Sequence, residues 1–280
     1  MEKRANLLKR IGKRLLIYIV LFYFLLSLAI YFKQDSIVFI PTQGPPFQTP
    51  TSLKLGFEDL RIKSAGYDIH AWYIPADANR GTVLFCHGNA GNLGDRMNNI
   101  SIWNRLGMNI LVFDYRGYGL SQGTTTEEGC YEDVEACYKW LQMNNRIQKP
   151  FIVHGRSLGG GVASWAAENL NFDGLILEST FTSIPAMGQY RFPFLPISLI
   201  SNIYFPTAER ISNITCPIQV FHSNDDEVVP YFMGEQLAKS ATVELQLLKG
   251  GHNSAYTFTN NYSEKLNEFI SRIKKSPVEP

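Results

Sequence analysis

The pattern of hydrophobic and polar positions divides the chain into three parts. Residues 15–32 are an apolar run of 18 residues without a charge, which is long enough for a helix that crosses a bilayer. Residues 33–56 contain four prolines and no periodic pattern, so they are expected to form a linker. From residue 57 onward, short apolar runs alternate with amphipathic stretches, a pattern typical of strands followed by helices.

Eight of the short apolar runs are predicted to be strands, and amphipathic helices are predicted between the later ones. The strands are expected at 57–63, 69–74, 82–86, 109–113, 151–154, 174–178, 218–222 and 243–248. The helices are expected near 95–105, 126–143, 158–169, 231–240 and 260–273. An Ala65-Gly66 turn joins the first two strands, and a capping box from Thr125 to Glu128 opens the second helix. Strands that alternate with helices indicate an α/β domain with a mostly parallel sheet.

The composition bounds the number of domains and the class of partner. At 280 residues and 45% hydrophobic content, the chain is long enough for one large domain, expected over 57–275, and short for two. Its net charge of +1 argues against nucleic-acid binding, which usually requires a basic excess. The sequence does not indicate an oligomeric state.

The segment before the apolar run is strongly basic. Its cations are Lys3, Arg4, Lys9, Arg10, Lys13 and Arg14. A positive flank predicts that residues 1–14 stay in the cytosol, that 15–32 span the membrane, and that the remaining chain lies in the periplasm or a lumen. A shallow interfacial helix is disfavoured because the run has no polar face. A signal peptide cleaved after Ala29 is the alternative.

Neither the cysteines nor the histidines have the spacing of a disulfide framework or a metal site. Cys130 and Cys137 lie in one predicted helix, too far apart for a bridge, so the four cysteines are expected to be buried thiols that act as small apolar fillers. His154 and His222 are expected to be core histidines bonded to backbone, and His70 is expected to be exposed. No metal and no cofactor are therefore expected.

Ser157 is the candidate nucleophile. It lies in FIVHGRSLGGGVASWAA, residues 151–167, which predicts a strand, a tight turn and an alanine-rich helix. The turn matches G-x-S-x-G, in which small residues on both sides allow a serine to occupy a sharp bend between strand and helix. This context favours a nucleophile over the alternative, a glycine-rich connection with a surface serine.

A serine nucleophile needs a histidine to accept its proton and a carboxylate to orient that histidine. Asp226, in IQVFHSNDDEVVP, and His252, in LQLLKGGHNSAY, each follow a late predicted strand. With the serine they have the chain order serine, acid, histidine. Asp225 and Glu227 are local rivals for the acid, and Glu178, directly after an earlier strand, is a more distant candidate.

The oxyanion of a tetrahedral intermediate needs hydrogen-bond donors. One expected donor is the N–H of Leu158, the residue after the nucleophile. The other is the N–H of Asn89, in the loop FCHGNAGNLGD after the third predicted strand, where the glycine lets the backbone approach closely. The alternative for this loop is a flexible glycine-asparagine turn.

Five motifs occur in order along the chain: HGNAGN, DYRGYGLSQG, GRSLGG, HSNDDEVVP and GGHN. Over residues 37–272 they resemble the serine-hydrolase branch of the α/β-hydrolase superfamily, and they are most similar to membrane-anchored, bud-emergence-type and depalmitoylase-like hydrolases. The resemblance implies an α/β-hydrolase fold with a small cap after the sixth strand. It implies a triad of Ser157, Asp226 and His252, with Asn89 and Leu158 as oxyanion donors. Ser223 departs from the pattern, because relatives usually have glycine there.

The cap expected over residues 181–212 is rich in aromatic residues. Its part from 181 to 206 carries six aromatic residues, four prolines and one formal charge. Phe181, Phe192 and Phe194 are predicted to line the substrate pocket, where each buried methylene of an acyl chain would add about 0.8 kcal/mol of binding. The alternative is that these side chains only pack the cap onto the sheet.

These features predict a membrane-anchored serine hydrolase that cleaves a carboxylic ester or thioester through an acyl-enzyme, with an acyl or lipid-linked substrate. Two alternatives remain open. One is an amide-cleaving peptidase of the same fold, and the other is a membrane-tethered scaffold that has lost its activity.

Overall fold

The structure, a computed structural model, describes residues 2–275, so Met1 of the basic segment lies outside it. One sheet holds eight strands in the order β1-β2-β4-β3-β5-β6-β7-β8. The strands are β1 (Glu58–Ser64), β2 (Tyr67–Ile74), β3 (Thr82–Cys86), β4 (Asn109–Phe113), β5 (Phe151–Arg156), β6 (Gly174–Glu178), β7 (Ile218–Ser223) and β8 (Leu245–Leu248). β2 is antiparallel to β1 and β4, and all other neighbours are parallel. The predicted mostly parallel sheet is confirmed.

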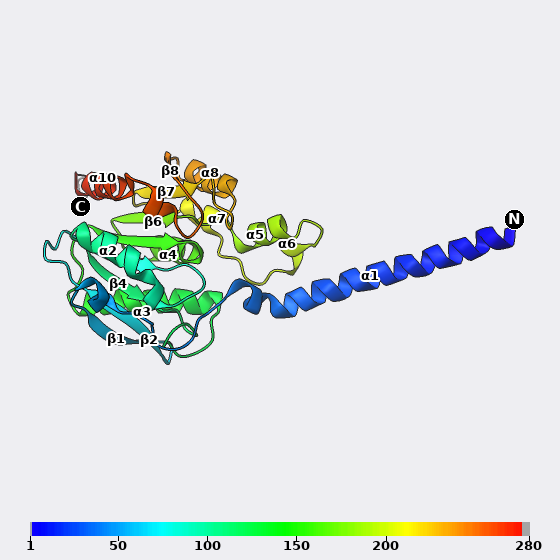
Figure 1. Ribbon diagram of the computed structural model, residues 1–280, viewed down its shortest axis with the longest axis horizontal. Coiled ribbons are helices and arrows are strands. Elements are labelled where there is room, and N and C mark those ends of the chain that lie inside the picture. Colours follow the sequence, from blue (N-terminus) through cyan, green and yellow to red (C-terminus); the bar gives the residue numbers. More distant parts are fainter. Residues whose placement is uncertain (1, 276–280) are drawn as a thin grey trace.

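Helices cover both faces of this sheet (Figure 1). The longer ones are α2 (Met97–Arg105), α3 (Glu127–Met143), α4 (Leu158–Asn169), α8 (Tyr231–Ser240) and α10 (Tyr262–Lys275). The shorter ones are η1 (Pro50–Leu53), η2 (Leu93–Arg96), α5 (Ile184–Arg191), α6 (Ile197–Ile200), α7 (Thr207–Ile211) and α9 (Ala255–Phe258). One core joins the sheet to α3, α4 and α8, and the other joins it to α2 and α10. Strands β3, β4 and β6 are buried along their whole length, as expected for strands covered on both faces.

Local chemistry explains the hairpin and corrects two expectations. Ala65 and Gly66 have φ of 44° and 91°, which a two-residue hairpin turn of type I′ requires. The N-cap of α3 is Thr126 and not Thr125, because the Thr125 hydroxyl donates instead to the Arg116 carbonyl oxygen at 2.7 Å. His70 is buried and not exposed, because Asp59 of β1 and Asp114 after β4 lie against its ring, at 3.1 and 3.9 Å.

The apolar run lies in α1 (Glu2–Val38), one helix of 37 residues that projects away from the sheet (Figure 1). An 18-residue stretch of it has a mean hydropathy of 2.6 and is only 6% buried. By length and composition, it can cross a membrane. The helix continues to Val38, so the start of the predicted linker is helical. No proline or glycine occurs between residues 33 and 38 to end it earlier.

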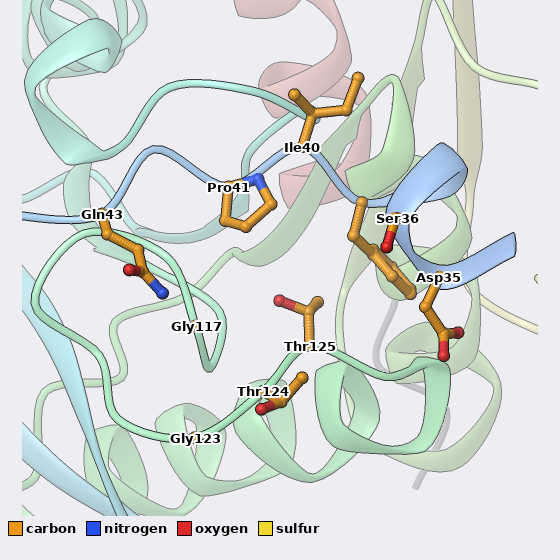
Figure 2. Close-up of a pocket in the computed structure, with 10 residues that line it drawn as sticks. Asp35, Ser36, Ile40, Pro41, Gln43, Gly117, Gly123, Thr124 and Thr125 are labelled. Atoms are coloured by element: carbon orange, nitrogen blue, oxygen red, sulfur yellow. The ribbon is translucent and has the colours of Figure 1, made fainter. Parts of the chain in front are cut away.

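Beyond α1 the chain lies along the domain surface. Gln43 forms a parallel β-bridge with Gly119. A neighbouring groove has a volume of about 410 Å³. It lies between Asp35, in the last turn of α1, and the loop with Thr124 and Thr125 that precedes α3 (Figure 2). Among the described residues that line this groove, none is a predicted catalytic residue, so the candidate active site lies elsewhere.

Candidate active site

Ser157 occupies the sharp turn between β5 and α4. Its backbone has φ 53° and ψ −121°, which a residue other than glycine adopts only where its surroundings impose it. Helix and strand approach each other closely at this turn. A Cβ on Gly159 would lie 2.0 Å from the Cys86 carbonyl oxygen, and a Cβ on Gly155 would lie 2.2 Å from the Gly159 carbonyl oxygen. The two glycines of G-x-S-x-G are therefore required by space.

The structure brings Ser157, His252 and Asp226 together. The Nε2 atom of His252 lies 3.0 Å from Ser157 Oγ. The Nδ1 atom of His252 lies 2.8 and 3.0 Å from the two carboxylate oxygens of Asp226. The three residues follow β5, β8 and β7 respectively, and the carboxyl ends of parallel strands share one edge of the sheet. The topology thus assembles side chains that are far apart in sequence.

Asp226 is held as a carboxylate. Its Oδ1 accepts hydrogen bonds from the N–H groups of Val228 and Val229 at 2.9 and 2.8 Å. Burial raises the pKa of Asp226, but the hydrogen bond and charge of His252 and the two backbone donors outweigh it, so the pKa lies below its ordinary value. A charged carboxylate can only accept hydrogen bonds. This assigns a proton to His252 Nδ1 and leaves Nε2 able to accept the Ser157 proton.

The rivals of Asp226 in its own loop bind the backbone and not the imidazole. Glu227 Oε2 accepts the backbone N–H of His252 at 2.9 Å. Asp225 Oδ2 accepts the N–H of Gly250 at 3.4 Å. Both carboxylates therefore link the loop after β8, which holds His252 (the histidine loop), to the loop after β7, which holds Asp226 (the acid loop). Of the three acidic residues, Asp226 contacts the ring of His252.

Glu178, the more distant candidate for the acid, supports the histidine loop indirectly. Its buried carboxylate accepts hydrogen bonds from Arg156 Nε at 3.0 Å and from the Tyr262 hydroxyl at 2.5 Å. Burial raises its pKa, but the bonds and charges of His154 and Arg156 outweigh burial and lower the pKa to about 2. Arg156 also donates to the carbonyl oxygen of His252. Glu178 therefore reaches the histidine through Arg156.

Sequence reasoning missed two of these supporting contacts. Arg156 is only 5% exposed, and a buried cation needs partners. A lone charge next to Ser157 in an apolar stretch was the available signal. Ser223, the departure from the usual glycine, donates its hydroxyl to the Gly250 carbonyl oxygen at 2.6 Å. It thus adds another link between the acid and histidine loops.

Asn89 and Leu158, the expected oxyanion donors, border the same cavity as Ser157. The loop before Asn89 approaches the nucleophile closely, since a Cβ on Gly88 would lie 3.2 Å from Ser157 Cβ. The Asn89 side chain is engaged elsewhere, because Nδ2 donates to the Val38 carbonyl oxygen at 2.5 Å. The Asn89 side-chain amide is therefore not free to serve the cavity, and the backbone N–H stays the expected donor. Leu158 begins α4, and N–H groups of a first helical turn lack partners within the helix.

The cavity next to Ser157 has a volume of about 260 Å³ and a mostly apolar wall. Its lining residues are Ile37, Val38, Asn89, Ser157, Leu158, Phe181, Ile184, Met187, Gly188, Arg191, Phe192, Val228 and Val229. Phe181 and Phe192 thus lie where the sequence analysis expects them. Phe194 does not, since it is 88% exposed and lies outside this lining. Arg191 fixes the cap to the acid loop by donating to the Glu227 and Val228 carbonyl oxygens, each at 3.0 Å.

The chain is similar to several known proteins. Residues 77–206 match the family model described as serine aminopeptidase, S33. The α/β-hydrolase domain-containing protein WAV2 of Arabidopsis thaliana is 32% identical over 234 residues, 74% of this chain and 76% of that protein. Lysophosphatidylserine lipase ABHD12 of Danio rerio is 33% identical over 231 residues, 75% of this chain and 59% of the lipase. The Pyrococcus furiosus esterase Pf2001 shares the fold, with a TM-score of 0.70, 23% identity, and coverage of 84% of this chain and 97% of the esterase.

Proposed function

Because the chain belongs to the α/β-hydrolase family and is a serine hydrolase, we propose that Ser157, His252 and Asp226 are its catalytic triad. The observation that carries this proposal is the unbroken chain of contacts from Ser157 Oγ through the imidazole to Asp226, at 3.0 and 2.8 Å. A hydroxyl is a weak nucleophile unless a base takes its proton. This arrangement supplies both the base and the group that orients it.

In the proposed reaction, Ser157 Oγ attacks the carbonyl carbon of an ester or thioester while its proton moves to His252 Nε2. Asp226 stabilises the imidazolium through the Nδ1 hydrogen bond. The backbone N–H groups of Asn89 and Leu158 bind the oxyanion. The intermediate then expels the alcohol or thiol, which takes the proton from Nε2, and leaves an acyl group on the serine. Water, deprotonated by the same imidazole, releases the acid and restores the hydroxyl.

The proposed substrate carries a medium or long acyl chain. The lining of the cavity includes Phe181, Phe192 and several aliphatic side chains, and a single formal charge, that of Arg191. Burial of an acyl chain against such a wall is favourable by about 0.8 kcal/mol per methylene. The similarity to a protein named a lysophosphatidylserine lipase supports a lipid ester. An amide substrate is the second candidate, because the matched family model is described as a serine aminopeptidase.

The proposed topology places α1 across a membrane with the N-terminus in the cytosol and the hydrolase domain on the other side. The support is the charge distribution, six cations before the apolar run and Lys33 directly after it. Protease added to sealed right-side-out vesicles is expected to degrade the domain. Protection until detergent opens the vesicles would reverse the orientation, and a mature chain that starts at Ile30 would show a cleaved signal peptide.

A fluorophosphonate probe tests the triad, because it labels only an activated serine. We expect the full chain to be labelled and the Ser157→Ala variant to remain unlabelled. Chromogenic esters from acetyl to dodecanoyl, with an anilide of matching acyl group, then define the substrate class. Labelling at another residue would refute the assignment of the nucleophile, and faster cleavage of the anilide would favour the peptidase.

A further inference from the structure

The cap presents an apolar surface next to α1. Phe194 is 88% exposed and Leu199 is 87% exposed. A groove of about 560 Å³ separates this part of the cap from α1, and it is lined by Val20, Tyr23, Phe24, Ser27, Leu28, Tyr31, Pro196, Leu199 and Ile200. The cap is also tied to α1 by hydrogen bonds, since the Asn202 N–H donates to Gln34 Oε1 at 2.8 Å. Figure 1 shows α5 and α6 on the side of the domain from which α1 projects.

The position of the groove along α1 fixes the depth of the cap. A helix rises 1.5 Å per residue, so the groove residues from Val20 to Tyr31 extend over about 16 Å. All of them lie inside the run 15–32, which the proposed function places in the bilayer. The cap residues that face this stretch, Pro196 to Ile200, therefore lie beside the middle of the span and the part of it nearer to the domain. If the span is in lipid, these cap residues are surrounded by lipid and not by water.

The chemistry of this part of the cap suits lipid. Residues 192–206 contain no Asp, Glu, Lys or Arg, so no charge has to be buried in hydrocarbon. The nearest cation, Arg191, is turned to the carbonyl oxygens of Glu227 and Val228 at 3.0 Å. An exposed apolar surface that continues from a membrane span marks a membrane contact.

We propose that the cap tip, residues 192–200, inserts into the bilayer leaflet on the domain side and opens a lateral route for an acyl chain from the membrane to Ser157. The inference rests on the proposed membrane span. The groove and the catalytic cavity are both lined by residues of α1 and of the cap, although they share no lining residue. On α1 the groove ends at Tyr31 and the cavity begins at Ile37, and in the cap the groove is lined by Pro196 and the cavity by Phe192. The substrate would then be an acyl lipid that never leaves the bilayer.

Spin labels measure the depth directly in the full chain, reconstituted in phosphatidylcholine–phosphatidylglycerol vesicles. Labels at Leu199→Cys, Phe22→Cys and Met143→Cys are compared in a Cys216→Ser background, where the remaining cysteines are buried. Met143 is the control, because it is an apolar residue that is 74% exposed and lies on the domain. It is the last residue of α3, and the first residue of that helix, Glu127, bonds to the cap. We expect oxygen collisions to dominate at Leu199 and Phe22, and collisions with a water-soluble nickel chelate to dominate at Met143.

The outcomes separate this inference from the proposed span. A Leu199 label in water with a Phe22 label in lipid overturns the inserted cap and leaves the span intact. Both labels in water overturn the span, and the inference with it. A second variant, Leu199→Glu, is expected to lower the rate on a long-chain ester in vesicles, relative to a soluble acetyl ester, about tenfold. The same substitution at Met143 should not lower this ratio, and an unchanged ratio for Leu199→Glu counts against the lateral route.

Discussion

The substitution Asp226→Asn should lower kcat about ten-thousandfold without unfolding the protein, because it changes the tautomer of His252. The amide keeps the size of the carboxylate but has one acceptor and one donor. The N–H groups of Val228 and Val229, which bind Oδ1 at 2.9 and 2.8 Å, retain the amide oxygen at that position. The NH₂ group then faces His252 Nδ1, where the carboxylate oxygen Oδ2 lies at 2.8 Å in the parent. A donor at this shorter contact favours an unprotonated Nδ1 over a hydrogen bond to the amide oxygen, which lies 3.0 Å from Nδ1, so the proton moves to Nε2. The imidazole can no longer accept the serine proton, a change that costs about 10⁴ in kcat in a serine protease with this triad.

The assay for this variant is the hydrolysis of a soluble chromogenic ester, with thermal unfolding as the check on the fold. Asp225→Asn is the matched control, since it makes the same chemical change one residue away, at a carboxylate that bonds the Gly250 N–H at 3.4 Å. It should lose less than tenfold. The reasoning is refuted if Asp226→Asn keeps kcat within tenfold of the parent. A greater loss in Glu178→Gln, with the fold intact, would move the acid to β6.

The remaining predictions concern the nucleophile, the pocket and the buried support. Ser157→Ala and His252→Ala should each lower kcat by about five to six orders of magnitude, and the double variant should be scarcely worse, which tests whether they act as a unit. Phe192→Ala should lower the octanoyl-to-acetyl ratio of kcat/KM about tenfold, which corresponds to the loss of about two methylene contacts. Phe194 lies outside the cavity, so Phe194→Ala should change this ratio less than twofold. Glu178→Gln should lower the free energy of unfolding by about 3–5 kcal/mol at pH 7. Because the folded pKa of about 2 lies below the ordinary 4.5, this deficit should narrow in denaturant titrations as pH falls below 4.5.

The sheet and its order of elements were predictable because their signals are local. Strands β3, β4 and β6 have the same limits as the predicted runs at 82–86, 109–113 and 174–178. Each is a short apolar run with a turn on either side, and periodicity finds such runs well. The candidates Ser157, Asp226 and His252 could be chosen for a related reason. In a parallel sheet, the residues that follow the strands lie at the same edge, so residues that are far apart in the chain lie close together in space.

The features that the sequence did not reveal depend on partners that are distant in the chain. Arg156 has a supporting role because Glu178 lies beside it on the next strand and the His252 carbonyl oxygen lies within reach. His70 shows the alternation of an exposed strand residue, yet its ring is buried and lies near Asp114, 44 residues later, whose Oδ2 is 3.9 Å from His70 Nδ1. The exposure of Phe194 depends on how the cap folds back, and aromatic composition does not specify this.

Helix α1 and the candidate active site are in direct contact. Ile37 and Val38, the last two residues of α1, line the cavity next to Ser157. The Asn89 side chain donates to the Val38 carbonyl oxygen at 2.5 Å and accepts the Ile40 N–H at 3.0 Å. The backbone of the same asparagine is the proposed oxyanion donor. Asn89 thus binds the end of α1 through its side chain, and in the proposed reaction it binds the oxyanion through its backbone N–H. The placement of α1 therefore also determines the placement of the loop that holds Asn89. Removal of residues 37–40 would take away both a wall of the cavity and the partners of the Asn89 side chain.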